Sequence, residues 1–217
     1  MKYLILSAVL GLTLGTSCAQ SGNDGVKIPL GSKGKPSPNE QVATFSEGCF
    51  WHSEIIFQSL EGVRDAVSGY AGGFTPDPTY EKVETGNTGY AETVNVYYDP
   101  SKISFETLVK AFFASHDPTQ LNRQGNDEGP QYRSIVFYRN DREKAIIEAQ
   151  IKQIADSKKY SGKIVTEVLP FKNFFPAEDY HQEYVFHHPE NGYVAGVCIP
   201  EYMEFRKSFP GPFKPGY

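Results

Sequence analysis

The sequence predicts an α+β fold, a two-layer ferredoxin-like βαββαβ plait with additional C-terminal helices and a strand. Two observations lead to this prediction. Short strand-like runs and amphipathic helical runs alternate as far as residue 138, and their order is that of the split βαβ arrangement. The chain of 217 residues is also long enough to bury one hydrophobic core.

The first three elements of the plait lie between residues 41 and 70. Gln41–Phe45 is a short strand candidate, and Trp51–Leu60 follows it as a helix. Val63–Tyr70 is a second strand, which ends at the triplet 71–73 because its two glycines favour a turn.

The second half of the plait repeats a strand, a helix and a strand. Ala91–Asp99 alternates in the manner of a half-buried strand. Ser104 is a suitable N-cap for the next helix, and Tyr132–Tyr138 supplies the fourth strand. The apolar residues that form one stripe of this helix are Phe105, Leu108, Val109, Phe112 and Phe113.

Three further elements must pack around the plait. Asp141 begins a longer helix that extends to about Ser157, and Lys163–Leu169 is a strand. Ala177–Phe186 is predicted to be helical, because Pro176 suits the beginning of a helix.

The N-terminus has the features of an export signal. A charged Met1-Lys2 start is followed by an apolar stretch that is too short to span a membrane as a mature helix. The ending Thr16-Ser17-Cys18 resembles a bacterial lipoprotein signal, in which Cys18 becomes the lipidated first residue. An ordinary secretory signal and an uncleaved anchor are the alternatives. We therefore expect an exported protein of the bacterial cell envelope, held by a lipid anchor and facing the periplasm.

These features divide the chain into four parts. Residues 1–17 are the predicted signal peptide, and residues 18–40 form a flexible spacer rich in Gly, Ser and Pro. Residues 41–209 form the predicted folded domain, which we expect to be a monomer. Residues 210–217 form an irregular tail.

Charge and histidine spacing exclude two classes of partner. The formal net charge of −5 comes without a Lys/Arg stripe, so the sequence does not favour nucleic acid or an anionic membrane surface as partner. Neither CxxC nor HExxH spacing occurs, so we expect no metal site. The histidines considered as ligands are His116, His181, His187 and His188.

Cys49 is the most informative single residue. Gly48 allows a tight turn between the first strand and the first helix, which places Cys49 at the helix N-terminus. The helix dipole and the unpaired N–H groups there favour a thiolate, and so would the adjacent His52. A small buried cysteine with a purely structural role is the alternative. The rings of Phe50 and Trp51 suit a substrate with a sulfur-bound methyl group.

Five blocks of sequence carry a resemblance to a known family. They are "GCFW" with Glu54 three residues on, "SGYAGG", "PTYEKVETGNTGYAE", "HDPTQLNRQGNDEGPQYRS" and "PAEDYHQEY". In this order they resemble the A-type peptide methionine sulfoxide reductases, from about residue 44 to residue 209. The resemblance implies reduction of methionine-S-sulfoxide, free or in proteins, as a repair of oxidised protein. It also implies no bound cofactor and an external reductant, either a thioredoxin-like protein or a small dithiol.

The resemblance also implies a role for each matching residue. Cys49 corresponds to the nucleophile that attacks the sulfoxide sulfur, and Glu92 to the acid that protonates the sulfoxide oxygen. A carboxyl in an aromatic pocket has a raised pKa, which suits such an acid. Phe50 and Trp51 correspond to the wall around the methyl group. The remaining polar residues of the pocket correspond to Tyr80, Asp127 and Tyr132.

The recycling step is where the sequence departs from the family. Attack leaves Cys49 as a sulfenic acid, and many relatives resolve it with a cysteine directly after "GY". That position is Val194 here, and Cys198 lies four residues later. The alternation in "VAGVCI" favours a strand with Cys198 buried, so we expect a structural Cys198. A shifted resolving cysteine is the alternative.

Two other classes of function stay open. A cysteine hydrolase would pair Cys49 with a base, for which His181 is the best candidate. A non-enzymatic envelope lipoprotein would have inert thiols. Turnover without a reductant would indicate the hydrolase, and a Cys49 that does not react with thiol reagents would indicate the lipoprotein.

Overall fold

The computed structural model describes residues 36–217. The predicted signal peptide 1–17, the lipidation site Cys18 and most of the spacer 18–40 lie outside the described residues. None of the helices within residues 36–217 has the length and apolar composition needed to cross a membrane.

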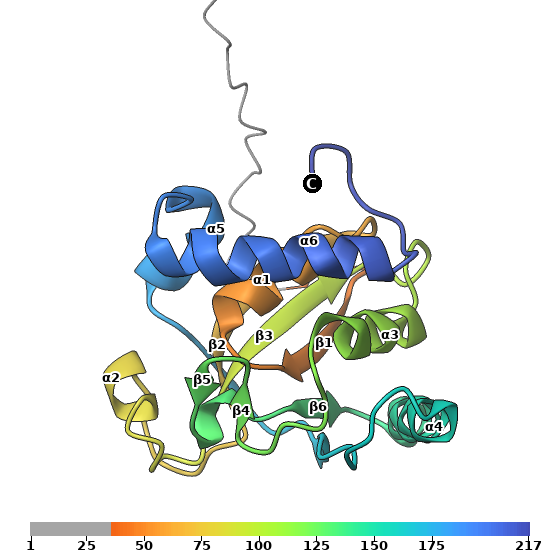
Figure 1. The fold of residues 1–217 in the computed structure, drawn as a ribbon, viewed down its shortest axis with the longest axis horizontal. Coiled ribbons are helices and arrows are strands. Elements are labelled where there is room, and N and C mark those ends of the chain that lie inside the picture. Colours follow the sequence, from red (N-terminus) through yellow and green to blue (C-terminus); the bar gives the residue numbers. More distant parts are fainter. Residues whose placement is uncertain (1–35) are drawn as a thin grey trace, which may run out of the picture.

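Regular elements follow one another closely along the chain (Figure 1). The α-helices are α1 (Phe50–Gln58), α2 (Tyr80–Val83), α3 (Phe105–Ser115), α4 (Asp141–Ser157), α5 (Tyr184–His187) and α6 (Ile199–Ser208). The strands are β1 (Gln41–Ser46), β2 (Val63–Ala71), β3 (Ala91–Tyr98), β4 (Arg123–Gln124), β5 (Asp127–Glu128), β6 (Ile135–Tyr138), β7 (Glu167–Pro170) and β8 (Phe174–Pro176). Short 3-10 turns occur at Pro130–Tyr132 and Asp179–His181, and a π-helical turn occurs at Val194–Cys198.

A six-stranded sheet in the order β7-β6-β1-β3-β2-β8 forms the centre of the molecule. Its strands pair antiparallel, except that β6 and β7 pair parallel. The predicted mixture of helices and strands is confirmed. The ferredoxin-like plait stays a prediction, since β7 and β8 extend the four central strands at both edges.

Aromatic side chains build the core between the sheet and the first helices. Phe45 of β1 stacks on Phe57 of α1 with ring centroids 4.8 Å apart, and on Phe112 of α3 at 5.4 Å. All three rings are fully buried, so each contributes the large apolar area that drives folding. The predicted N-cap is present, because the Ser104 side chain accepts a hydrogen bond from the Thr107 N–H.

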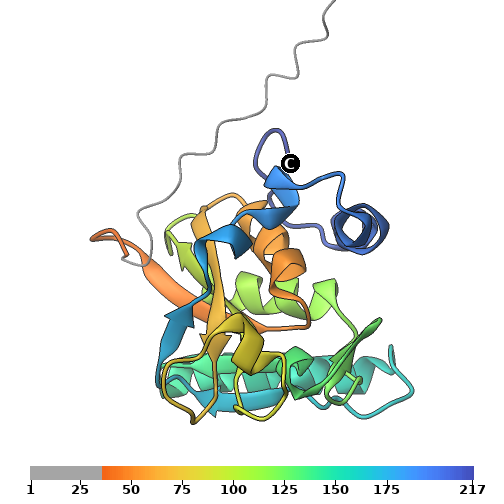
Figure 2. The same ribbon diagram turned by 90° about the vertical axis from the view of Figure 1, so that its left-hand side faces the viewer.

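The helical side of the sheet is thicker than two layers. α1 and α3 pack against the sheet, and α6 packs on the outer side of both helices (Figure 2). This outer helix is one of the additional C-terminal elements expected around the plait, and the two-layer plait itself stays a prediction. The extra layer matters for function, because it brings the C-terminal segment over the beginning of α1.

The predicted helix Ala177–Phe186 is wrong for most of its length. The segment holds one 3-10 turn and the short α5, with Glu183 between them at a positive φ of 52°. The side chain of Gln182 pairs with the backbone of Ser68 in β2, through an N–H and a carbonyl at 3.0 Å each. These contacts with β2 hold the segment in an open conformation that a continuous helix could not adopt.

The strand predicted in "VAGVCI" is also wrong. The side chain of Asn191 accepts hydrogen bonds from the N–H groups of Tyr193 and Val194, as a helix N-cap does. The residues that follow are therefore helical, first as the π turn and then as α6. Two predicted strands are shorter than expected, since β6 begins at Ile135 and β7 at Glu167.

The C-terminal tail is irregular, as predicted, but it is held in place. Glu61 donates its N–H to the Pro212 carbonyl, and Leu60 pairs with Phe213 in an isolated bridge. The Lys214 ammonium donates to the Gln58 carbonyl at 2.6 Å. The tail thus satisfies carbonyl groups at the C-terminal end of α1, the end away from Cys49.

Candidate active site

The turn between β1 and α1 positions the Cys49 thiol. Gly48 has a φ of +104°, and a Cβ atom there would lie 2.8 Å from the Cβ of Gln124. Both observations require glycine at this position. Cys49 is the N-cap residue of α1, so its side chain lies beside the first N–H groups of the helix.

Glu92 meets Cys49 at the beginning of α1. Its carboxyl Oε2 accepts a hydrogen bond from the Phe50 N–H at 2.9 Å, and the residue is 2% exposed. Burial raises the pKa of Glu92 well above its ordinary value and the nearby Cys49 raises it further, whereas the Phe50 N–H partly lowers it. The pocket therefore favours the neutral carboxylic acid at this position.

The surroundings of Cys49 favour its thiol form. Burial raises the pKa of Cys49 well above its ordinary value, and the nearby Cys198 raises it further. The hydrogen bond from the Trp51 N–H lowers this pKa by less. The expectation that the helix N-terminus favours a thiolate is thus wrong, because burial outweighs the effect of the helix.

His52 does not supply the expected positive charge. Its ring is buried, and Nδ1 lies 3.6 Å from Oε2 of Glu201 on α6. Burial lowers the pKa of His52 to about 4, and the nearby His116 acts in the same direction. His52 is therefore neutral at pH 7 and does not stabilise a thiolate at Cys49.

Aromatic rings form one wall beside Cys49. Phe50 is buried, with its ring centroid 4.9 Å from His181 and 6.5 Å from Tyr80. Trp51 stacks face to face on Tyr184 at 3.7 Å. The Trp51 indole N–H donates to Nδ1 of His181 at 3.1 Å, which fixes the plane of the indole ring. Such a wall suits an apolar group that carries sulfur.

The three remaining predicted polar residues lie on different elements around this pocket. Tyr80 begins α2, where its N–H donates to the Glu178 carboxylate at 3.0 Å. Burial raises the pKa of Tyr80, and the nearby carboxylate of Glu84 adds to this effect. Burial also raises the pKa of Tyr132, to which Glu92 is the next largest contributor. Both phenols therefore remain hydrogen-bond donors beside Glu92 and Cys49.

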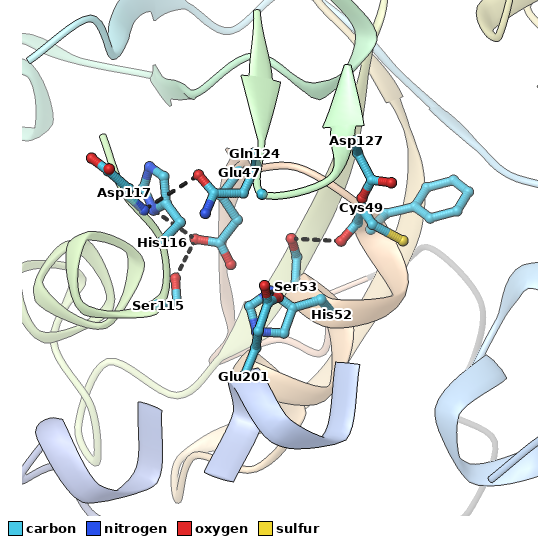
Figure 3. Close-up of polar contacts among 12 residues, drawn as sticks. Glu47, Cys49, His52, Ser53, Ser115, His116, Asp117, Gln124, Asp127 and Glu201 are labelled. Carbon is cyan, nitrogen blue, oxygen red and sulfur yellow. Dashed lines mark hydrogen bonds and ion pairs between the residues drawn. The ribbon is translucent and has the colours of Figure 1, made fainter. Parts of the chain in front are cut away.

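Asp127 is the third of these residues and connects the β4–β5 hairpin to the C-terminal segment. Its carboxylate accepts a hydrogen bond from the hydroxyl of Tyr193. Burial raises the pKa of Asp127, and this hydrogen bond partly lowers it. Figure 3 shows Asp127 and Cys49 close together at the beginning of α1.

Four neighbours of the pocket were not assigned to it from the sequence. Glu84 accepts a hydrogen bond from Tyr132, and Tyr193 and Tyr184 both contact Trp51. His181 was considered only as a metal ligand and as the base of a hydrolase. Three of the four lie in the segment 181–193, whose aromatic content was the one available signal.

Cys198 is a neighbour of Cys49 rather than a remote core residue. It is fully buried at the last position of the π turn, where α6 begins. Its thiol is near enough to raise the pKa of Cys49, and both cysteines are free. Although the predicted strand is wrong, the prediction that Cys198 is buried is confirmed.

A second group of buried polar side chains lies behind the Cys49 turn (Figure 3). Glu47 is 1% exposed, and its Oε2 accepts a hydrogen bond from the Ser115 hydroxyl at 2.6 Å. Nδ1 of His116 lies 3.6 Å from the same oxygen. Ser53 donates to the Cys49 carbonyl at 3.3 Å, which ties this group to the turn.

This buried group predicts a stability that depends on pH. Burial raises the pKa of Glu47 to about 8, whereas the unfolded chain loses this proton near its ordinary value of about 4.5. The free energy of unfolding should therefore fall as pH rises toward 8, by at most ~1.4 kcal/mol per pH unit for this one group. Denaturant titrations at pH 7.0, 7.5 and 8.0 would measure the slope.

Glu47→Gln is the matched comparison, because it keeps the shape and removes the titrating proton. Its slope between pH 7 and pH 8 should be shallower than that of the wild-type protein. His52 and His116, each with a pKa lowered to about 4, act with the opposite sign below pH 6.5. The comparison is therefore made above pH 7. Equal slopes in the two proteins would contradict the assignment to Glu47.

The arrangement does not resemble a hydrolase or a metal centre. His181 pairs with the Trp51 indole rather than with Cys49, so the hydrolase is not favoured. Within residues 36–217 no group of three or more His, Cys, Asp and Glu side chains is arranged to hold a metal ion. Instead, a thiol and a neutral carboxylic acid share one aromatic pocket with a second thiol beside them. These groups define an oxidoreductase that uses cysteine chemistry.

Comparisons with known proteins agree with that class. Residues 41–211 match the family model described as peptide methionine sulfoxide reductase. The chain is 44% identical over 183 residues to the peptide methionine sulfoxide reductase MsrA of Polynucleobacter asymbioticus. The aligned residues cover 84% of this chain and 96% of that protein. It is also 44% identical over 176 residues to MsrA of Thermus thermophilus, which covers 81% of this chain and 99% of that protein.

Solved structures give the same result. Methionine sulfoxide reductase A of Corynebacterium diphtheriae matches with a TM-score of 0.64 and 37% identity, covering 70% of this chain and 77% of that one. The reduced form of Mxr1 from Saccharomyces cerevisiae matches with a TM-score of 0.59 and 35% identity, covering 72% and 91%. The chain therefore belongs to the peptide methionine sulfoxide reductase family. It is an oxidoreductase that reduces methionine sulfoxide.

Proposed function

We propose that this enzyme reduces methionine-S-sulfoxide, free or in proteins, through a sulfenic acid on Cys49. The observation that carries the proposal is the position of Glu92, which is 2% exposed and whose carboxyl accepts the Phe50 N–H at 2.9 Å at the beginning of α1, next to Cys49. Burial favours the neutral form of this carboxyl. The S preference comes from the family resemblance alone.

The proposed chemistry transfers one oxygen atom and two electrons. The Cys49 Sγ attacks the sulfoxide sulfur while Glu92 donates its proton to the sulfoxide oxygen, since an unprotonated oxygen is a poor leaving group. The thiol proton of Cys49 restores the proton of Glu92. The oxygen ends on Cys49 as a sulfenic acid, and the substrate sulfur leaves as methionine. Cysteine sulfur is oxidised and methionine sulfur is reduced.

Other residues of the pocket hold the substrate in this scheme. Phe50 and Trp51 contact the methyl group of the substrate, and the stack of Trp51 on Tyr184 at 3.7 Å keeps the wall rigid. Tyr80 and Tyr132 donate hydrogen bonds to the sulfoxide oxygen, because their raised pKa values keep both hydroxyls protonated. Asp127 acts through Tyr193, whose ring packs edge-on against Trp51 at 6.1 Å.

The assay that tests the function uses protein that lacks residues before Ser21, a methionine sulfoxide peptide and dithiothreitol. We expect turnover of the S epimer, with methionine formed in equal amount to oxidised dithiol. A folded sample that reduces neither epimer would exclude the proposal. Turnover of an ester or peptide bond without reductant would instead revive the hydrolase.

For recycling, we now favour Cys198 as the resolving cysteine, against the expectation from sequence. The support is the place of Cys198 at the beginning of α6, where its thiol is near enough to Cys49 to raise the pKa of that thiol. The Cys198 thiol attacks the sulfenic acid and releases water, and the two sulfurs form a disulfide. A dithiol reductant, such as a thioredoxin-like protein, then exchanges with this disulfide and restores both thiols. A disulfide requires α-carbons within about 7 Å of each other. The π turn that carries Cys198 therefore has to adjust locally wherever the two residues are farther apart.

Cys198→Ser tests this step. One equivalent of substrate should convert the wild-type protein to a Cys49–Cys198 disulfide, whereas the variant should accumulate a sulfenic acid that dimedone traps. Turnover with a thioredoxin should fall on the order of tenfold or more, although the first equivalent of methionine still forms. Mass spectrometry reads both products. Dimedone labelling of the wild-type protein as its main product would return Cys198 to a structural role.

The cellular location is a separate proposal that rests on the N-terminal sequence. We propose export to the bacterial envelope with lipidation of Cys18, so that the enzyme repairs oxidised envelope proteins. Mass spectrometry of protein made in a bacterial host should find a diacylglyceryl-modified N-terminal Cys18. A soluble product that begins at another residue would disprove lipidation and leave export intact.

A further inference from the structure

Glu84 places a second carboxyl against the proposed pocket. It follows α2 directly, and the Tyr132 hydroxyl lies 3.2 Å from each of its carboxylate oxygens. The residue is half-buried. Within residues 36–217, Tyr132 is the side chain that satisfies this carboxylate with a hydrogen bond.

The electrostatic surroundings of Glu84 are acidic. Burial raises the pKa of Glu84, and the nearby carboxylate of Asp127 raises it further. The negative charge of Glu84 is in turn felt by Glu92 and Tyr80. The nearby cation on α2, Lys82, is exposed and donates to the Asp77 carbonyl at 2.7 Å. Glu84 thus contributes an uncompensated negative charge beside the pocket.

Substrate binding would change the partner of Glu84. In the proposed function, on which this step rests, Tyr132 donates its single proton to the sulfoxide oxygen. It cannot donate that proton to Glu84 at the same time. A half-buried carboxylate that loses its donor costs free energy unless a new donor replaces it. A lysine or arginine of the substrate, next to the oxidised methionine, would supply a charged donor.

We propose that Glu84 is a specificity-determining residue, which selects oxidised methionines flanked by a basic side chain. The substrate class is therefore a polypeptide with Lys or Arg beside methionine sulfoxide. An acidic flanking side chain is repelled by Glu84 and by Asp127, and is a poor substrate.

Three peptides that differ only in the residues flanking methionine sulfoxide test the proposal. One has Lys before and after it, one has Gln, and one has Glu. The wild-type kcat/KM should fall in the order Lys, Gln, Glu, by about fivefold per step, the size expected of a partly exposed charge pair. The order should weaken at high ionic strength, because salt screens the interaction.

Two variants with the same change in charge distinguish a local effect of Glu84 from an effect of the net charge of the protein. Glu84→Gln should reduce the Lys-to-Glu ratio to within about twofold, as expected once the local charge is removed. Glu61→Gln, in the exposed turn after the far end of α1, should keep the wild-type ratio. A thermal melt shows that each variant is folded.

The outcomes distinguish this inference from the proposed function. If the wild-type enzyme reduces the neutral Gln peptide but treats all three peptides alike, the role of Glu84 is wrong and the proposed function stands. The same holds if Glu84→Gln keeps the full preference. If no peptide is reduced, the proposed function itself fails.

Discussion

Cys49→Ser is expected to reduce turnover to the rate measured without enzyme. A serine hydroxyl at neutral pH is a far weaker nucleophile than cysteine sulfur, and it cannot carry the oxygen as a sulfenic acid. The pocket makes this dependence stronger. Because burial already holds the Cys49 thiol neutral, a group with a still higher pKa has no means of activation there. Initial rates with a methionine sulfoxide peptide and excess dithiol give the comparison.

The serine variant is expected to fold. The side chain of Cys49 makes no capping hydrogen bond, and its backbone supplies the N-cap geometry of α1. Cys198→Ser is the matched control, because it removes the other thiol of the pair and should still release the first equivalent of methionine. A Cys49→Ser protein that turns over substrate above background would show that the reaction does not pass through this thiol.

The central strands and the long helix could be predicted because their patterns are local. β2 and β3 were predicted to within one residue at each end. For α4, both the first and the last residue agree with the prediction. β3 alternates clearly, and α4 begins after Asn140, whose side chain accepts a hydrogen bond from the Glu143 N–H. Such signals lie within the segment itself and do not depend on distant neighbours.

The C-terminal segment could not be predicted because distant residues determine it. The helix expected for residues 177–186 gives way to an open turn held by Ser68 and by Glu54, whose Oε1 accepts the Glu183 N–H at 3.0 Å. The sequence separation is 114 residues for Ser68 and 129 for Glu54. No local pattern contains such a contact.

The candidate site shows the same limit. Cys49 was found from its own neighbourhood, a glycine and a thiol at a strand-to-helix junction. The family resemblance, not the pattern around Glu92, drew attention to that residue, because a carboxyl on an alternating strand looks like a solvent-facing group. Its pairing with the Phe50 N–H joins residues that are 42 positions apart. The pKa of Cys49 was predicted in the wrong direction because the sequence does not report burial.

Glu92→Gln is expected to lower kcat/KM on the order of 10²-fold or more, the usual contribution of a general acid. The amide oxygen of glutamine can still accept the Phe50 N–H, so the beginning of α1 should keep its geometry. The amide cannot release a proton to the sulfoxide oxygen. The loss should therefore appear in kcat rather than in KM alone, because the missing interaction belongs to the transition state.

The pH dependence of kcat/KM distinguishes the loss of a proton donor from a change in the geometry of the pocket. The pKa of Glu92 is raised, so the active acid form is present below that pKa and disappears as pH rises through it. Wild-type kcat/KM should fall along this alkaline limb, and the glutamine variant should lack the limb at its lower rate. Glu54→Gln is the control, since it neutralises another buried carboxyl of raised pKa, about 8, which bonds to Ser68 and the Glu183 N–H. If Glu92→Gln runs at the wild-type rate with the wild-type pH profile, Glu92 is only a strand residue and the proton comes from elsewhere, the Tyr80 and Tyr132 hydroxyls being the remaining donors in the pocket.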